Sequence, residues 1–373
     1  MTVLSNLKLF DGTRFLDETA ISFDNGTITA LGTMTNGIDM GGRLLSPGLI
    51  DLHMHGQMGE DNMRPGGTTR IAITQLQFGV TSFCPTSVTD SDEQTRVFLE
   101  NVRLTMESAQ GARVLGAYLE GPYLDYELRG VHDERFLKEP FISHYRALVE
   151  GYEDLIVRVT LAPEKKGGME LVRFLADQGI TVSIGHSAAT AVETTEAVRL
   201  GVSTTTHTFN AMPALHHRQP GVLGVALTHP DLKAEFVADM VHIHPLIVKL
   251  IYLAKGVEGC FYCTDSMEAA GMRDGIYRLG NGTVSVQNGI ARKGERLAGS
   301  TLTMDQGLRL LVEDADIPLH DALRMGTRNP ADVIGRPDLG RLVPGAKADF
   351  VLWDDTLHVE ATYVEGRCLF RAD

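Results

Sequence analysis

The sequence lacks the long apolar segments that membrane insertion or export requires. Nowhere in its 373 residues are there about 20 consecutive apolar residues, the length that a membrane-spanning helix needs. The first residues, MTVLSNLKLFDGTRF, have no basic stretch followed by an apolar core, which is the pattern of a secretory signal. We therefore expect a cytoplasmic protein that does not bind membranes.

Cysteine is also scarce, and its placement argues against a disulfide framework. The chain has four cysteines, which are Cys84, Cys260, Cys263 and Cys368. They are too few and too scattered to hold together a chain of this size. Two of them form a CxxC, but it lies in the apolar run GCFYCTD, which is typical of a buried strand. We interpret this pair as structural rather than redox-active.

Basic residues are outnumbered by acidic ones, 34 against 48, which gives a formal net charge of -14. Nucleic acid and anionic membrane surfaces would be repelled over most of such a protein. The charge therefore excludes nucleic acid as a partner. A small anionic substrate would need a local basic pocket.

The middle of the chain alternates short apolar runs with helical segments, a pattern that predicts parallel strands joined by crossover helices. The candidate strands are LLSPGLIDLHMH, VTSFCPTS, RVLGAYLEGP, LIVRVTLAPE, TVSIGHS, STTTHTFN, LKAEFVAD and GCFYCTD. Eight such units predict an α/β fold, a (β/α)8 TIM-like barrel over residues 46–335. Catalytic residues of this architecture lie at the carboxyl ends of the strands.

The two ends of the chain have a different pattern, with short alternating strands separated by glycine turns. Examples are AISFDNGTITALG near the start and ADFVLWDD near the end. We expect residues 1–45 and 336–373 to pack together as a small β-sandwich domain beside the barrel. The single tryptophan, Trp353, is predicted to lie in the core of that domain.

Ionisable residues occur where the apolar strands end. These residues are His53, His55, Glu120, His186, His207 and Asp265. Burying such groups without partners would cost several kcal/mol each. Shared coordination of a metal at the barrel mouth removes that cost, and imidazoles with carboxylates suit zinc or iron. The pattern therefore predicts a metal site.

The residues around these positions resemble the amidohydrolase superfamily and, within it, the N-acetylglucosamine-6-phosphate deacetylases. The resemblance rests on blocks that follow the family's order along the chain: PGLIDLHMHG, LEGPYL, GVH, IGHS, THTFNAMPALHHRQPGVLG, VADMVHIHP, CTDSMEAAG and LAGSTLTM. They extend over nearly the whole chain. As a set they are far more specific than the HxH motif alone.

The resemblance implies a metal-dependent hydrolase of linear amides. Glu120, His186 and His207 are implied as ligands of the principal metal, and Asp265 as the catalytic acid and base. Family members differ at the first strand, and this chain retains His53 and His55 there. One or two divalent ions remain possible, with zinc favoured over iron and Glu120 bridging if there are two.

The resemblance also implies substrate contacts. The corresponding residues are His132, Asn210, Ala211, Arg218, His242, Leu297 and Ala298. His132 would steady the amide carbonyl, while Arg218 and His242 would contact the phosphate, helped by backbone amides near Asn210. In the family that arginine reaches the neighbouring subunit's site, so a homodimer is implied. Gly299 permits close backbone approach in a loop expected to close over the sugar.

The expected reaction is deacetylation of N-acetyl-D-glucosamine 6-phosphate to glucosamine 6-phosphate and acetate by metal-activated water. The galactosamine epimer is an open alternative, because it differs only in the orientation of one hydroxyl group. An amidohydrolase acting on a cyclic amide, a nucleobase or a dipeptide is a second alternative, disfavoured by the phosphate contacts. A non-catalytic barrel is a third, and the complete set of ligands argues against it.

Overall fold

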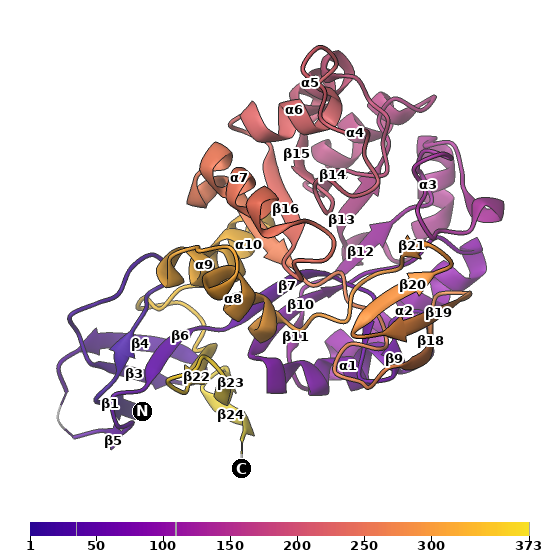
Figure 1. The fold of residues 1–373 in the computed structure, drawn as a ribbon. Helices are drawn as coiled ribbons and strands as arrows, with labels where there is room; N and C mark the ends of the chain where they lie inside the picture. Colours follow the sequence, from indigo (N-terminus) through magenta and orange to yellow (C-terminus); the bar gives the residue numbers. More distant parts are fainter. Residues whose placement is uncertain (35, 109, 373) are drawn as a thin grey trace.

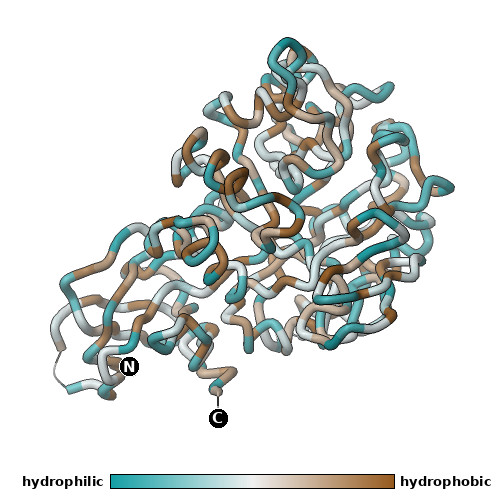
Figure 2. Tube along the Cα trace, viewed as in Figure 1, coloured by the Kyte–Doolittle hydropathy of each residue, from teal (hydrophilic) through white to brown (hydrophobic). Residues whose placement is uncertain are grey.

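The computed structural model describes residues 1–34, 36–108 and 110–372. A large region of parallel strands and helices lies beside a smaller region of strands that contains both chain termini (Figure 1). In Figure 2 the outermost loops are largely hydrophilic, while hydrophobic residues recur along the strands and helices. Within the described ranges, no helix is long and apolar enough to cross a membrane.

All of the predicted parallel strands are present in the large region. They are β7 (Leu49–Met54), β10 (Val80–Pro85), β12 (Ala117–Glu120), β13 (Ile156–Leu161), β14 (Thr181–Ile184), β15 (Val202–Thr205), β16 (Lys233–Val237) and β17 (Cys260–Cys263). One sheet runs from β12 to β17 in chain order, and a second joins β7 and β10 to the short β11 (Arg113–Val114). Parallel bridges between Met54 and Ser266 and between Thr86 and Tyr118 link the two sheets at both seams. The result is a curled parallel sheet of the TIM-like type.

Helices follow these strands, as the alternation predicts. They are α1 (Gly67–Thr74), α2 (Asp92–Ser108), α3 (Ile142–Val149), α4 (Gly168–Asp177), α5 (Ala191–Leu200), α6 (Gly221–Thr228), α7 (Pro245–Lys255) and α8 (Met304–Glu313). Helix α4 buries Leu171, Val172 and Leu175, an apolar stripe with helical spacing. Helix α5 begins with a capping box between Thr190 and Glu193. Two further helices, α9 (Leu319–Gly326) and α10 (Arg328–Val333), complete the region.

The first predicted strand is divided at Gly48 into β6 (Leu44–Pro47) and β7. Strand β6 pairs with β22 (Phe350–Trp353) of the smaller region, whereas β7 pairs with β10. A Cβ at Gly48 would lie 2.0 Å from Oγ1 of Thr81, so only glycine fits at this change of sheet.

The smaller region contains two sheets from opposite ends of the chain. One has the order β4-β3-β1-β5 and the other β2-β6-β22-β23-β24. Their bounds are β1 (Thr2–Ser5), β2 (Lys8–Leu9), β3 (Ala20–Asp24), β4 (Thr27–Gly32), β5 (Ile38–Asp39), β23 (Val359–Val364) and β24 (Arg367–Arg371). Leu4 and Phe23 of the first sheet share a buried cluster with Leu45 and Phe350 of the second.

Trp353 differs from its predicted place. It is fully buried, but it belongs to the hydrophobic cluster of the large region, together with Val351 on the same strand. Phe350 and Leu352 point the other way, into the core of the smaller region. The reason is that side chains alternate between the two faces of β22, so one face packs in the core of the large region and the other in the core of the smaller region. Trp353 Nε1 donates to Ser46 Oγ at 2.8 Å.

An antiparallel sheet that the sequence did not predict lies between β17 and α8. It contains β18 (Gly275–Leu279), β19 (Gly282–Gln287), β20 (Ile290–Lys293) and β21 (Arg296–Leu297). Its buried residues pack with Val88 and Met267, close to the carboxyl ends of β10 and β17 (Figure 1). This sheet therefore lies over the rim where the predicted site residues gather.

Candidate metal and substrate site

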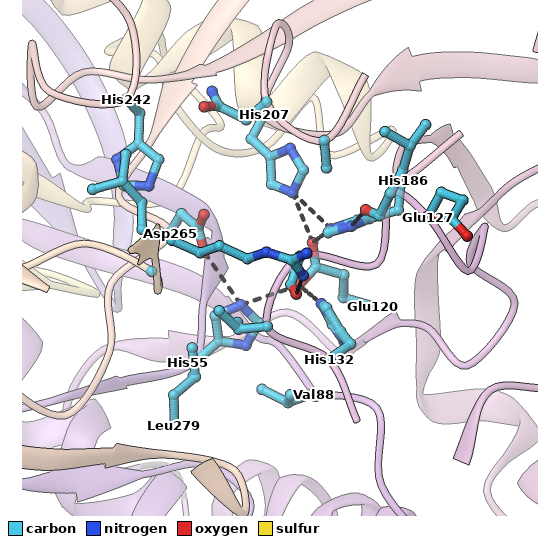
Figure 3. A pocket seen from close by; sticks show the side chains of 18 residues that line it. His55, Val88, Glu120, Glu127, His132, His186, His207, His242, Asp265 and Leu279 are labelled. Carbon is cyan, nitrogen blue, oxygen red and sulfur yellow. Dashed lines mark hydrogen bonds and ion pairs between the residues drawn. The ribbon is translucent and has the colours of Figure 1, made fainter. Parts of the chain in front are cut away.

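The ionisable residues predicted at the strand ends meet at one rim of the parallel sheet. Each lies at or within two residues of the carboxyl end of its strand: His53 and His55 for β7, Glu120 for β12, His186 for β14, His207 for β15 and Asp265 for β17. All are at least nine-tenths buried. Because parallel strands end on the same side, residues far apart in sequence converge there (Figure 3).

Glu120, His186 and His207 form one candidate metal-binding group. Glu120 Oε1 is 3.3 Å from His186 Nε2 and 3.1 Å from His207 Nε2, and the two nitrogens are 3.0 Å apart. His186 Nδ1 donates to the carbonyl of Leu128 at 2.8 Å, which leaves a lone pair on Nε2. The two imidazole nitrogens and the carboxylate oxygen face one another, and such an arrangement suits the coordination of a divalent cation. These three residues therefore fit a metal.

His53, His55 and Asp265 form a second candidate group beside the first. Nε2 of His55 lies 3.2 Å from both Glu120 Oε2 and Asp265 Oδ1, and Nε2 of His53 lies 3.5 Å from the same two oxygens. Within the described part of the chain, the buried His53 Nε2 has no hydrogen-bond partner. Glu120 faces the first group with Oε1 and the second with Oε2, so its geometry suits a bridging carboxylate.

Carboxylates and imidazoles shift one another's pKa in the two groups. Burial opposes ionisation of Glu120, but the surrounding imidazoles, His53 above all, outweigh it and hold the pKa of Glu120 well below its usual range. Burial also opposes the charge of His55, yet Asp265 and Glu120 raise its pKa to about 9. Burial lowers the pKa of His186 to about 4, which keeps that ring neutral and able to coordinate. Anionic carboxylates beside a neutral imidazole favour a bound cation.

Three of these residues have left-handed backbones immediately after their strands. The φ angles are 49° at His186, 31° at His207 and 48° at Asp265. Such a conformation costs a non-glycine residue on the order of 1–3 kcal/mol and is typical of functional sites. At Asp265 the turn is held by hydrogen bonds from its N–H to the carbonyl of His53 at 2.8 Å and from the N–H of Ser300 to its carbonyl at 2.7 Å.

A cavity of about 370 Å³ opens above the two groups, large enough for a small substrate. Its lining includes several residues that the sequence predicted, which are His55, Glu120, His132, His186, His207, Asn210, Ala211, His242, Asp265 and Leu297. His53 is fully buried behind this layer. Figure 3 shows Glu120 and His132 on one side of the cavity and His242 on the other.

His132 presents a defined nitrogen to the site. Its Nδ1 accepts from the N–H of Thr89 at 3.1 Å and lies 2.8 Å from Thr89 Oγ1. Because Nδ1 accepts, the ring proton of the neutral imidazole is on Nε2, which lies 3.4 Å from Glu120 Oε2. His132 can therefore donate a hydrogen bond to a carbonyl oxygen held in the cavity.

At the other side of the cavity, His242 and Asn210 offer donors. Asp239 Oδ2 lies 2.7 Å from His242 Nδ1. Burial opposes the charge of His242, but Asp239 outweighs it and raises the pKa of His242. Among the described residues, Nδ2 of Asn210 has no hydrogen-bond partner although it is buried. An amide N–H donor without a partner and an imidazole with a raised pKa both suit the binding of an anionic substrate group.

Leu297, the last residue of β21, and Gly299 in the loop after it line the cavity, whereas Ala298 between them is fully buried. Gly299 has a φ of 62°, and a Cβ there would lie 3.1 Å from the carbonyl of Asp265. The close approach predicted for this glycine is thus present.

Arg218 lies apart from the cavity in this chain. It is exposed on the loop before α6, with Nη1 2.7 Å from His217 Nε2. It is not among the residues that line the cavity. Arg218 is therefore not brought together with the other predicted substrate residues within this chain.

Two charged residues of the lining do not follow the sequence pattern that predicted the others. Arg296 lines the cavity from β21 and donates to the carbonyl of Gly130 at 2.9 Å, and Glu127 lines it from the loop after β12. Neither ends a parallel strand, so the pattern that located the other residues could not identify them. The hairpins of the β18–β21 sheet did have a signal, because the turn pairs Gly280-Asn281 and Asn288-Gly289 separate short alternating runs.

Two fully buried charges behind the site were also missed. Arg158 on β13 and Glu235 on β16 form an ion pair, and Glu235 Oε1 lies 2.9 Å from His53 Nδ1. A signal was present in the sequence: each is a charged residue inside an otherwise apolar strand, in LIVRVTL and LKAEFVAD. A charge in such a strand requires a partner.

The sequence and the fold of this chain are similar to those of known proteins. Residues 44–369 match the model of the amidohydrolase family. The N-acetylgalactosamine-6-phosphate deacetylase of Escherichia coli O157:H7 is 34% identical, with 98% of each chain covered. The N-acetylglucosamine-6-phosphate deacetylase of Vibrio furnissii is 33% identical, with coverage of 98% of this chain and 94% of that protein. A solved mutant N-acetyl-D-glucosamine-6-phosphate deacetylase of Mycobacterium smegmatis, in complex with N-acetyl-D-glucosamine-6-phosphate, has a TM-score of 0.93 and 29% identity, with 99% of each chain covered.

Proposed function

This chain belongs to the amidohydrolase family, and we propose that it hydrolyses N-acetyl-D-glucosamine 6-phosphate to glucosamine 6-phosphate and acetate. The observation that carries the proposal is the convergence of Glu120, His186 and His207 with Asp265 beneath a cavity that offers donors on both sides. Relatives that cover almost the whole chain have this activity in their names.

Glu120, His186 and His207 would hold a divalent metal, zinc by preference and iron as the alternative. When bound, such an ion activates water at neutral pH and polarises the amide carbonyl. His53 and His55, with Asp265, would hold a second ion. The spacing of the ligand atoms, all within 4.8 Å of one another in each group, supports both assignments.

Asp265 is the proposed acid and base. Burial opposes its ionisation, but His53 and His55 outweigh it and hold the pKa of Asp265 low, so the group is a carboxylate at neutral pH. It takes a proton from the water that attacks the acetyl carbonyl. It then gives that proton to the sugar nitrogen, so the C–N bond breaks to release acetate and the amine. His132 donates from Nε2 to the carbonyl oxygen as negative charge develops there.

The phosphate is proposed to lie on the side of His242 and Asn210. The raised pKa of His242 and the unpartnered Nδ2 of Asn210, together with the backbone of Ala211 at the cavity wall, support this orientation. The exposed Arg218 would complete the phosphate site of the other subunit in a homodimer. The loop of Leu297 and Ala298 would close over the sugar.

The proposed organisation keeps the predicted boundaries, with the barrel over residues 46–335 and a β-sandwich domain from residues 1–45 and 336–373. The pairing of β6 with β22 supports a small domain built from both ends. The cytoplasmic location expected from the sequence is part of the proposal.

N-acetylgalactosamine 6-phosphate is the second candidate substrate, because a relative of 34% identity over 98% of the chain is named for it. The two sugars differ at one hydroxyl group, so both would present the same acetamide and phosphate. Cyclic amides and dipeptides lack the phosphate that the donors around His242 suit, and they are disfavoured.

The test is acetate release by the purified, metal-analysed protein from N-acetylglucosamine 6-phosphate. The galactosamine epimer and unphosphorylated N-acetylglucosamine are assayed beside it. The proposal expects the glucosamine phosphate to have the highest kcat/KM and the unphosphorylated sugar to be a poor substrate. A higher kcat/KM for the epimer would support the second candidate. No hydrolysis of any of the three with metal bound would refute the substrate assignment.

A further inference from the structure

A carboxylate behind the site links the two candidate metal groups. Glu235 is fully buried on β16. Of the strands from β12 to β17, β13 and β16 are the two whose ends contribute no predicted metal ligand or catalytic residue. Its Oε1 accepts from the backbone N–H of His207 at 3.0 Å and lies 2.9 Å from His53 Nδ1. One oxygen atom thus contacts a residue of each group.

Arg158 fixes Glu235 as an anion. The guanidinium is fully buried and pairs with Glu235 Oε2 through Nη1. Its other terminal nitrogen donates to Ser183 Oγ at 3.0 Å, and the guanidinium carbon lies 4.3 Å from the centre of the Tyr118 ring. A charge so enclosed needs its partner, because an isolated buried guanidinium is strongly unfavourable.

The anion determines the tautomer of His53. An ionised carboxylate can only accept, so the proton of the 2.9 Å contact is on His53 Nδ1. In the neutral ring that a metal ligand requires, Nε2 then carries the lone pair, and Nε2 points to Glu120 Oε2 and Asp265 Oδ1, each 3.5 Å away. A carboxylate on the far nitrogen of a ligating histidine orients the ring and raises its basicity.

We propose that Glu235, fixed by Arg158, is a positioning residue that makes His53 a metal ligand and so decides whether the first-strand site holds a second divalent cation. The inference rests on the metal assignment of the proposed function and deepens it. The principal group of Glu120, His186 and His207 contacts Glu235 only through a backbone N–H, and should depend on it far less.

A metal held by Glu235 itself is the rival interpretation, because His53, Glu235 and Cys263 also lie within 4.8 Å of one another. The charges argue against it. A cation there would face the Arg158 guanidinium, and both oxygens of Glu235 already have partners. The thiol of Cys263 contacts the carbonyl of Phe236 at 3.7 Å instead.

The test measures bound zinc rather than activity. The full chain loaded with zinc is dialysed against graded concentrations of a zinc chelator, and zinc per chain is counted by atomic absorption. We expect two zinc ions in the unaltered protein. Glu235→Gln should weaken the more labile one by about 10–100-fold, the usual effect of removing such a partner, and leave the other nearly unchanged.

Two further variants guard against simple destabilisation. The double variant Arg158→Met with Glu235→Gln removes both buried charges, so it should fold even if the single variant does not, and it should show the same zinc loss. Asp349→Asn breaks another ion pair, between a buried carboxylate next to β22 and the partly buried Arg113 of the barrel. It should leave both zinc affinities unchanged, and an equal loss in this control would overturn the inference.

The decisive comparison uses a background of His53→Ala. If Glu235 acts through His53, adding Glu235→Gln should not weaken the remaining zinc further. A further loss there, unchanged zinc in Glu235→Gln, or a single zinc in the unaltered protein would each refute the inference. Failure of the proposed function is seen separately, as absent acetate release from a protein that still holds its zinc.

Discussion

Replacement of Asp265 by asparagine tests the proposed chemistry most directly. The side chain keeps its shape, but an amide cannot take a proton from water near neutral pH. Asp265 lines the cavity with Oδ1 3.2 Å from His55 Nε2, and it lies outside the principal metal group. Proton transfer by a positioned group contributes about 10²–10⁴-fold to rate. We expect kcat to fall by that factor, or about 3–5 kcal/mol in the activation barrier.

The assay is steady-state acetate release from saturating N-acetylglucosamine 6-phosphate, with zinc per chain measured on the same samples. Asp349→Asn is the matched control, since it also neutralises a buried carboxylate but lies at the junction with the smaller region. The variant at Asp265 should retain at least the principal metal and lose turnover, and the control should retain both. A kcat within tenfold of the unaltered enzyme, with metal bound, would remove Asp265 from the proton-transfer role. Loss of all bound metal would make it a principal ligand instead, which also contradicts the assignment.

Three other outcomes follow from the same geometry. Arg218→Ala should raise KM for the phosphorylated sugar by about 10–100-fold, which corresponds to the loss of a hydrogen bond to a charged group. KM for the unphosphorylated sugar should not change. An equal rise for both sugars would contradict a phosphate contact. His53→Ala should remove at most one metal ion per chain, and loss of both would show that the first-strand site is the principal one. Because Asp239 raises the pKa of His242 above 6.5, its cation should aid phosphate binding at and below that pH and be lost as pH rises through the raised pKa. KM for the phosphorylated sugar should then climb on the alkaline side, and His242→Gln should flatten that dependence.

Much of the site could be predicted because the polar residues interrupt a simple pattern. His186 and His207 each follow an apolar strand, and an ionisable group at such a position needs a partner. Parallel strands end on one side, so their end residues meet whatever the details of packing. The same logic applied inside the strands would have revealed Arg158 and Glu235, whose charges stand in apolar runs. Arg296 gave no such signal, because its segment is short, polar and exposed.

By itself the sequence determined the order of the parallel strands and their helices and the ionisable residues at the strand ends, because the periods of apolar residues and the polar strand ends are local properties. Only the tertiary structure decided how those residues divide into groups. The family resemblance implied a bridging Glu120 and an Arg218 that serves another subunit, but the oxygen that Glu120 turns to each group and the contact of Glu235 with His53 depend on distances between strands far apart in sequence. Those distances follow from the curl of the sheet and the packing of its two seams, which no local pattern encodes.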